Sequence, residues 1–420
     1  MHLTLKRLSH IIIVLFIITQ VFAFSLSFMD SIYDSGIWQQ EINAVYQFRN
    51  LSFVASIFII LVYARVTIDD LLLLFGGMMV YAITFFLFSE NIPYFREIEP
   101  LTKYIFVAYA AVRAKLVPFQ TLKKAFIWSA RIVSILLIFA LLQNVTVLNF
   151  QNIYMEFANA ISMSIAILLY STIIDKSAID LILSVTGLLL LLTYGSRGAL
   201  MTLCILAAYL VWIQYKNTKI VYVILFLSIL IVMTGPAVLS LALEWMTKAG
   251  LNSRTLEKLL SGKFLVSNDR LQIYRYLFKV LRDNFIFGVG LCGDRYYLPL
   301  RFTGVDATYA HNLILELYLD FGVIIGTIIM TIMGYLLYVC YFNEEDLERK
   351  GLFSAFFTVG FLQLMTSRSW ITEQNFFIFF ALLLTYSTST RIKFVWEINK
   401  SGGVKNETDC ECNHSNLWWR

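Results

Sequence analysis

The chain has 420 residues, of which 59% are hydrophobic and 15% are charged, and its formal net charge is +5. Soluble domains contain roughly 45–50% apolar and about 25% charged residues, so this composition excludes an ordinary soluble protein. The sequence has neither a basic tail nor an aromatic-basic pattern, which argues against nucleic acid as a partner.

Apolar runs long enough to cross a membrane recur along the chain. A helix needs about 20 such residues to cross roughly 30 Å of hydrocarbon. Hydropathy predicts spans near 11–29, 48–64, 71–89, 101–117, 125–142, 157–174, 178–193, 198–214, 220–243, 311–342, 352–368 and 373–390. We therefore expect an all-α polytopic membrane protein with about 12 transmembrane helices and one large outer loop.

Loop lysines and arginines predict the orientation, because cytoplasmic loops retain these residues. With the N-terminus inside, the short outer loops contain only Arg49, Arg96, Lys103, Arg197 and Arg368. This orientation divides the chain into helices 1–9 (1–243), a large periplasmic or extracellular loop (244–310), helices 10–12 (311–390) and a cytoplasmic tail (391–420). The tail sequence from Cys410 to His414 has too few ligands to predict a metal site.

Residues 268–283 of the outer loop have the periodicity of an amphipathic helix. A helical wheel places these apolar residues on one face: Leu271, Tyr274, Leu277, Phe278 and Leu281. The cations Arg275, Lys279 and Arg282 lie opposite, and their simpler interpretation is a polar face near anionic lipid headgroups.

Arg270 differs because it falls on the apolar side of this helix, in the first turn. An arginine there is costly unless it meets an anion, and helix N-termini favour anions. A phosphate ligand and a structural ion pair both explain it.

A second candidate lies in the short outer turn 194–199, which contains Arg197 between two glycines. A rim arginine commonly contacts lipid headgroups. A glycine-flanked turn can also bring the guanidinium close to a ligand, and arginine binds phosphate bidentately.

A third candidate is His311, at the beginning of the long helix predicted over 311–342. Asn312, Glu316 and Asp320 follow on the same otherwise apolar helix. Ionisable groups in a membrane helix are candidates for function, and histidine is suited to proton transfer near neutrality.

Together these segments resemble a known superfamily. The sequence SRGA at 196–199 is followed by D-R-L-x-x-Y from Asp269, D-N-x-x-F-G-V-G from Asp283, and A-H-N-L-x-L-E-L-x-x-D-F-G from Ala310. Their order and spacing, over roughly residues 190–330, resemble those of the O-antigen polymerase and O-antigen ligase superfamily.

The resemblance implies metal-independent, inverting glycosyl transfer from an undecaprenyl diphosphate donor at the outer face of the bacterial inner membrane, without a cofactor. Arg197 and Arg270 would bind the diphosphate leaving group, and His311 would activate or orient the acceptor hydroxyl. Further substrate contacts would come from Asn312, Glu316 and Arg368.

Three functions remain open. A polymerase joins repeat units of O-antigen or a related surface polysaccharide, and the stretch L-E-L-Y-L-D-F-G resembles polymerases. A ligase would transfer the chain to lipid A-core in lipopolysaccharide biosynthesis. A flippase is less favoured, because transporters commonly show internal repeats, which this sequence lacks. The partners implied are the lipid-linked saccharide, membrane lipids and a chain-length regulator protein.

Overall fold

The computed structural model describes residues 2–33, 39–63, 68–99, 101–144, 150–194, 196–216, 268–302 and 309–386, with isolated positions between 240 and 248. The predicted tail 391–420 and nearly all of the predicted span 220–243 lie outside the described residues. Most of the loop predicted between 244 and 267 also lies outside them.

Every regular element in these ranges is a helix. The first half contains α1 (His2–Val21), α2 (Ala23–Tyr33), α3 (Gln39–Tyr63), α4 (Ile68–Leu87), η1 (Ser89–Ile98), η2 (Leu101–Ile105), α5 (Phe106–Arg113), α6 (Phe119–Asn144), α7 (Phe150–Ile174), α8 (Ala178–Tyr194) and α9 (Arg197–Tyr215). The second half contains α12 (Asn268–Asp283), α13 (Gly293–Arg301), α14 (Leu313–Tyr338), η3 (Val339–Asn343), α15 (Leu347–Gly360), η4 (Leu362–Met365) and α16 (Gln374–Tyr386).

Among the residues that the structure describes, four helical segments are long and apolar enough to cross a membrane. They are Asn43–Val62, Met155–Ile174, Arg197–Tyr215 and Leu313–Asn343, and the bent pair α1 and α2, with 66° between them, would make a fifth. Three shorter apolar helices accompany them, Gly76–Leu87, Ala178–Thr193 and Gln374–Tyr386. The all-helical expectation is confirmed for the described residues, while the count of about twelve spans stays a prediction.

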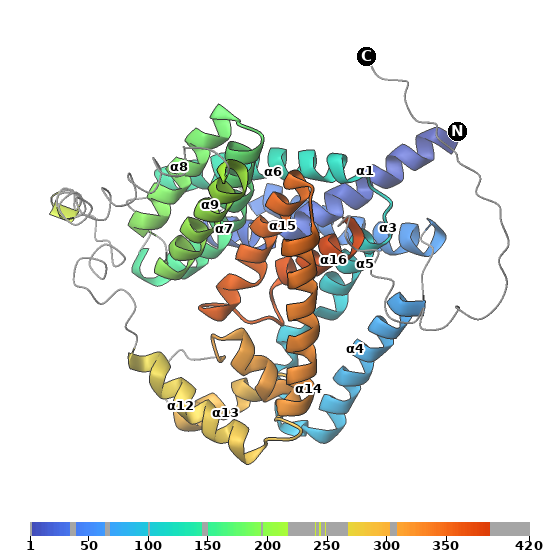
Figure 1. The fold of residues 1–420 in the computed structure, drawn as a ribbon, viewed down its shortest axis with the longest axis vertical. Helices are drawn as coiled ribbons and strands as arrows, with labels where there is room; N and C mark the ends of the chain where they lie inside the picture. Colours follow the sequence, from blue (N-terminus) through green and yellow to red (C-terminus); the bar gives the residue numbers. More distant parts are fainter. Residues whose placement is uncertain are drawn as a thin grey trace.

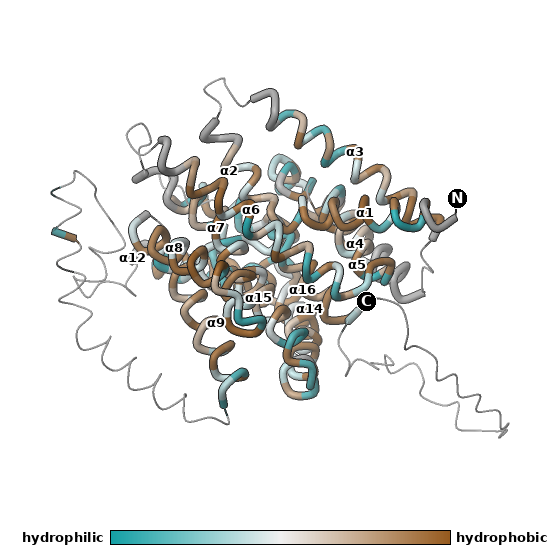
Figure 2. The backbone as a smooth tube through the Cα atoms, turned by 90° about the horizontal axis from the view of Figure 1, so that it is seen from above, coloured by the Kyte–Doolittle hydropathy of each residue, from teal (hydrophilic) through white to brown (hydrophobic). Residues whose placement is uncertain are grey.

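Helix α7 packs against five other helices, α2, α6, α8, α9 and α15 (Figure 1). Its inward residues are small or apolar, and Ser162, Ser164 and Ala166 are fully buried. Figure 2 shows apolar residues along the outer helices α8 and α9. On α8, Ile179 and Ile182 are more than half exposed, as expected for side chains that face hydrocarbon.

The predicted spans, with the N-terminus inside, leave the loops near 118–124, 175–177 and 343–351 in the cytoplasm, and charged residues of these loops meet at one end of the bundle. The ammonium of Lys123 lies 2.7 Å from a carboxylate oxygen of Asp175 and 3.2 Å from one of Glu348. Arg349 donates to the carbonyl of Tyr386 over 2.8 Å. Because α15 and α16 form an antiparallel pair, the loop 366–373 between η4 and α16 lies at their opposite end.

A glycine-rich turn packs backbone to backbone against a kink in α14. Gly322 interrupts this helix with φ 73° and ψ 174°. The amide of Val289 donates to the carbonyl of Leu319 over 2.6 Å, and the amide of Val323 donates to the carbonyl of Phe285 over 2.9 Å.

Glycine is required on both sides of this contact. A Cβ at Gly288 would lie 2.3 Å from the Leu319 oxygen, and one at Gly322 would lie 2.0 Å from the Ile286 oxygen. Both residues also have positive φ, which side chains disfavour. The glycines of F-G-V-G and D-F-G therefore fix the turn and α13 against the first half of α14.

Candidate functional site

His311 lies just before α14, in the left-handed region with φ 52°. Asn312 is the N-cap of α14, and its side-chain oxygen accepts from the amide of Leu315 over 3.0 Å. The centroid of the Tyr309 ring lies 4.0 Å from the centroid of the His311 imidazole, and the Tyr274 hydroxyl donates to the His311 carbonyl over 3.4 Å. A non-glycine residue with this backbone conformation persists only where its surroundings hold it.

The imidazole of His311 is held neutral. Burial, and after it the positive charges of Arg270 and Arg295, lower its pKa to about 4, while the backbone of Ser367 acts in the opposite direction. Within the described structure, Nδ1 is buried and has no hydrogen-bond partner. In the neutral tautomer that carries no proton on Nδ1, this nitrogen has a free lone pair.

The structure brings Arg270 close to His311. Its charge also lowers the pKa of Tyr274 and Tyr309, although burial outweighs it and raises the pKa of Tyr309 to about 12. The Tyr309 hydroxyl donates to the carbonyl of Ser367 over 2.7 Å. Arg270, the two tyrosines and His311 therefore form one group between α12 and α14.

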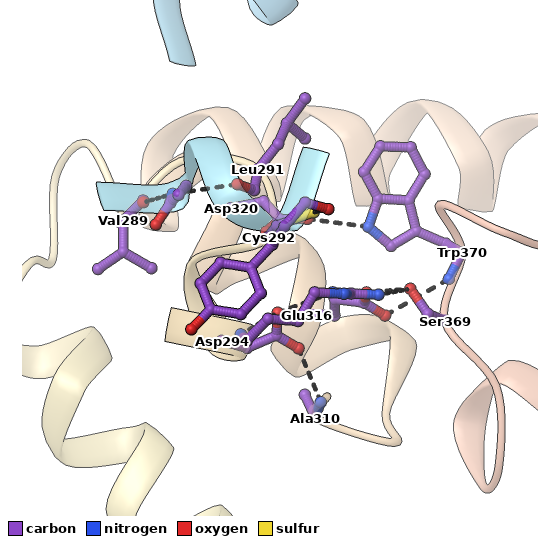
Figure 3. A network of polar contacts seen from close by, with 12 residues as sticks. Val289, Leu291, Cys292, Asp294, Ala310, Glu316, Asp320, Ser369 and Trp370 are labelled. Atoms are coloured by element: carbon purple, nitrogen blue, oxygen red, sulfur yellow. Dashed lines mark hydrogen bonds and ion pairs between the residues drawn. The ribbon is translucent and has the colours of Figure 1, made fainter. Parts of the chain in front are cut away.

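Beneath this group lies a fully buried polar network around Arg295 of α13 (Figure 3). One guanidinium nitrogen lies 2.8 Å from Asp294 and 3.3 Å from Glu316, and another donates to the Ser369 hydroxyl over 2.7 Å. The hydroxyl of Ser369 also bonds Glu316. Charge-assisted bonds of this kind are stronger than neutral ones, so the network ties α13 to α14 and to the loop 366–373.

The same network reaches the chain on both sides of His311. Asp294 accepts from the amide of Ala310 over 2.7 Å. The indole of Trp370 donates to Asp320 over 3.0 Å, while the other oxygen of this carboxylate is buried without a partner among the described residues. The network therefore fixes Ala310 on one side and the loop that carries Ser367 on the other.

The remaining predicted site residues have other positions. Glu316 is fully buried in the network, and Asn312 uses its side-chain oxygen as a helix cap, so their contacts with substrate stay predictions. Arg368 is also buried and bonds Glu373 and Asn159, with 2.8 Å between its Nε and the side-chain oxygen of Asn159. A phosphate contact by Arg368 would require these bonds to change.

Arg197 is the first residue of α9, where the Ser196 side chain accepts from the amide of Ala199. The next residue, Gly198, faces Thr366, whose hydroxyl would lie 3.1 Å from an added Cβ. This contact puts the N-terminus of α9 beside the loop 366–373, on which the environment of His311 also depends.

The face predicted for α12 was partly wrong. The side chains of Ile273, Leu277, Val280 and Leu281 are the buried ones, whereas Leu271 and Phe278 are 50% and 59% exposed. The wheel had grouped Leu271 and Phe278 with the buried face because they are apolar, but packing against α13 and α14 selects a different side of the helix.

Sequence reasoning missed Asp294, Arg295, Ser369 and Trp370. The stretch from Gly293 reads as a turn, yet a nine-residue helix begins there after Cys292, which has φ 63°. Its one available signal was an adjacent acid and arginine in an apolar chain, which predicts an ion pair but not its partners. Among the described residues, no group of three or more His, Cys, Asp and Glu side chains could hold a metal ion.

Comparison with protein families matches residues 182–331 to the family described as O-Antigen ligase. This segment contains Arg197, Arg270, His311 and the Arg295 network, apart from the loop 366–373. Neither the curated proteins nor the solved structures give a match. The match confirms the resemblance to the O-antigen ligase and polymerase superfamily.

Proposed function

We propose that this chain, whose residues 182–331 match the O-antigen ligase family, polymerises undecaprenyl-diphosphate-linked oligosaccharide repeat units. The product would be O-antigen or a related surface polysaccharide, made at the outer face of the bacterial inner membrane. The carrying observation is the partly buried, neutral imidazole of His311, whose buried Nδ1 has no partner among the described residues and lies near the charge of Arg270.

In this proposal, Arg270 and Arg197 bind the diphosphate leaving group of the donor. A sugar diphosphate is already activated, so the main demand is to stabilise the charge that builds on the leaving oxygens. Fixed arginines meet this demand in a site that excludes water. Nδ1 of His311 accepts the proton of the acceptor hydroxyl as that oxygen attacks the anomeric carbon and the bond to the diphosphate breaks.

A pKa of about 4 makes the free imidazole a weak base. Part of that lowering comes from the positive charge of Arg270, and an anionic diphosphate bound there would offset it. Donor binding therefore raises the pKa of His311, which makes it a stronger base only when the reaction can proceed.

The proposed orientation agrees with two groups of residues. Lys123, Asp175 and Glu348, assigned to the cytoplasm, meet at one end of α15, and the loop 366–373 lies at the other. An impermeant reagent should label a cysteine introduced at 260 in intact spheroplasts but not one at 120 or 346. Labelling at 120 from outside would contradict this orientation.

The family match is equally compatible with a second candidate, an O-antigen ligase that transfers the finished chain to lipid A-core. Deletion of the gene followed by electrophoresis of surface polysaccharide separates the two. Core that carries a single repeat unit supports the polymerase, whereas long chains retained on the lipid carrier support the ligase. Unchanged polysaccharide would contradict both.

A further inference from the structure

The solvent-facing side of α12 carries large apolar side chains that no described element covers. Leu271 and Phe278 are 50% and 59% exposed, and the turn that follows exposes Phe285 by 54%, Ile286 by 51% and Phe287 by 75%. Large exposed apolar side chains that gather on one side of a helix mark an interaction site.

The exposed residues of α12 separate into strips when they are placed on a wheel of about 100° per residue. Leu271 and Phe278 form an apolar edge, and the exposed Phe285 follows two residues after the end of the helix. The cations lie beside this edge and not opposite it, in the order Arg282, Arg275 and Lys279, and Gln272 and Asp283 complete the far side. This sequence of apolar, cationic and polar strips is typical of a helix that lies in a membrane interface.

The exposure of the turn 285–287 follows from its backbone. Gly288 and Gly322 bring the turn into direct contact with the kink of α14, and bonds of 2.6 Å and 2.9 Å hold it there. The turn cannot rotate to bury these side chains without breaking the bonds that fix α14.

Two neighbouring segments extend the same surface. The end of α4 lies close to the glycine-rich turn, because the Thr84 hydroxyl accepts from the amide of Leu291 over 3.4 Å. The last residues of α4, Phe86 and Leu87, are 78% and 70% exposed. On α14, Ile324 and Ile328 are each 55% exposed and lie just after Gly322. Both isoleucines belong to the candidate membrane span Leu313–Asn343, so the apolar surface beside α12 continues into one that faces hydrocarbon.

We propose that α12 is an interfacial helix that binds an anionic lipid surface. Its apolar edge enters the hydrocarbon boundary while Arg275, Lys279 and Arg282 contact lipid phosphates. Cations near an anionic membrane surface are attracted to it over about a Debye length. The helix thereby fixes Arg270 and Tyr274, on its inner side, at the level of the headgroups. Only the assignment to the outer leaflet rests on the proposed function.

The test uses the full chain without its native cysteines, reconstituted in vesicles that contain phosphatidylglycerol. A nitroxide is attached in turn at 278, 285 and 272, and its collision rates with oxygen and with a water-soluble nickel chelate are measured. We expect oxygen to dominate at 278 and 285 and the nickel chelate to dominate at 272. Equal nickel accessibility at 278 and 272 would overturn the proposal.

A charge variant separates lipid binding from burial against protein. Replacing Arg275, Lys279 and Arg282 together by Gln should raise nickel accessibility at 278, and vesicles of pure phosphatidylcholine should do the same to the unsubstituted chain. Spin–spin broadening at 278 between copies of the chain would instead identify a dimer interface and overturn the proposal. Neither readout requires turnover, so the result is independent of the glycosyl transfer proposed above.

Discussion

Removal of Arg295 should destabilise the protein more than removal of any exposed arginine of the same helix. Arg295 is 1% exposed, and its partners Asp294 and Glu316 are fully buried. Arg295→Gln leaves both carboxylates without their guanidinium partner, and breaking a buried pair from one side costs about 3–5 kcal/mol. Ser369→Ala removes hydrogen bonds but no charge, so we expect a smaller loss of about 1.5–3 kcal/mol.

The assay is thermal unfolding of the purified variants in one detergent, with Arg301→Gln as the matched control. Arg301 is exposed and ends the same helix, so its substitution should change stability by no more than about 0.5 kcal/mol. In the double variant Arg295→Gln, Glu316→Gln, the loss should be smaller than the sum of the single losses, because the residues are in direct contact. An Arg295→Gln protein as stable as Arg301→Gln would refute the reasoning.

Three further predictions concern the kink, the arginines and the acid dependence. Gly322→Ala should prevent stable folding, because the new Cβ would lie 2.0 Å from a backbone oxygen. Gly334→Ala should be tolerated, because no atom lies within 4 Å of the added Cβ. Equal expression levels and unfolding temperatures of the two variants would contradict this prediction. Arg270→Ala and Arg197→Ala should each abolish product in an assay with lipid-linked repeat unit. Arg270→Lys and Arg197→Lys should retain only part of the activity, because a point charge cannot reproduce the bidentate guanidinium contact. A comparable loss of activity in an Arg301→Ala control would contradict a special role for the two arginines. The pH dependence of kcat/KM reports the free enzyme, so kcat/KM should fall as the pH drops below about 4. The value of kcat should begin to fall at a higher pH, because the bound diphosphate raises the pKa of His311. The same acidic midpoint for both quantities would exclude the proposed effect of donor binding.

The stability of the folded protein should fall as the pH drops, because His311 is harder to protonate in the folded than in the unfolded chain. The pKa of His311 is about 4 in the folded protein against 6.5 for the free side chain. Its contribution to stability is therefore fully present above the unfolded value and is lost as pH falls through the folded value. Acid unfolding of His311→Asn should be less steep over this window, and Asn tolerates the left-handed backbone at this position.

Local pattern predicted the helix at 268–283 and its bounds, because its period and polarity are encoded within the segment. The pattern did not predict which side of this helix packs. Leu271 and Leu277 are equally apolar, and only contacts with α13 and α14, distant in sequence, distinguish the exposed one from the buried one.

The site shows the same limit. The sequence made His311 and Arg270 candidates, since a histidine at a helix start and an arginine on an apolar face are unusual on their own, and their roles stay predictions. It could not join Arg295 to Ser369, because 74 residues separate them and only the folded loop 366–373 brings them to 2.7 Å. It also assigned Glu316 to substrate, since an ionisable residue in an apolar helix does not reveal whether its partner is a ligand or a buried arginine.

The central claim is that Nδ1 of His311 accepts the proton of the acceptor hydroxyl. The direct measurement is polymerisation in vitro of purified lipid-linked repeat unit by wild type and by His311→Gln at matched protein levels, with donor binding measured in parallel. We predict that His311→Gln binds the donor and loses transfer by about 10²–10⁴-fold, the usual contribution of a positioned base. Near-normal turnover by the glutamine variant would contradict general-base catalysis and leave His311 with an orienting role.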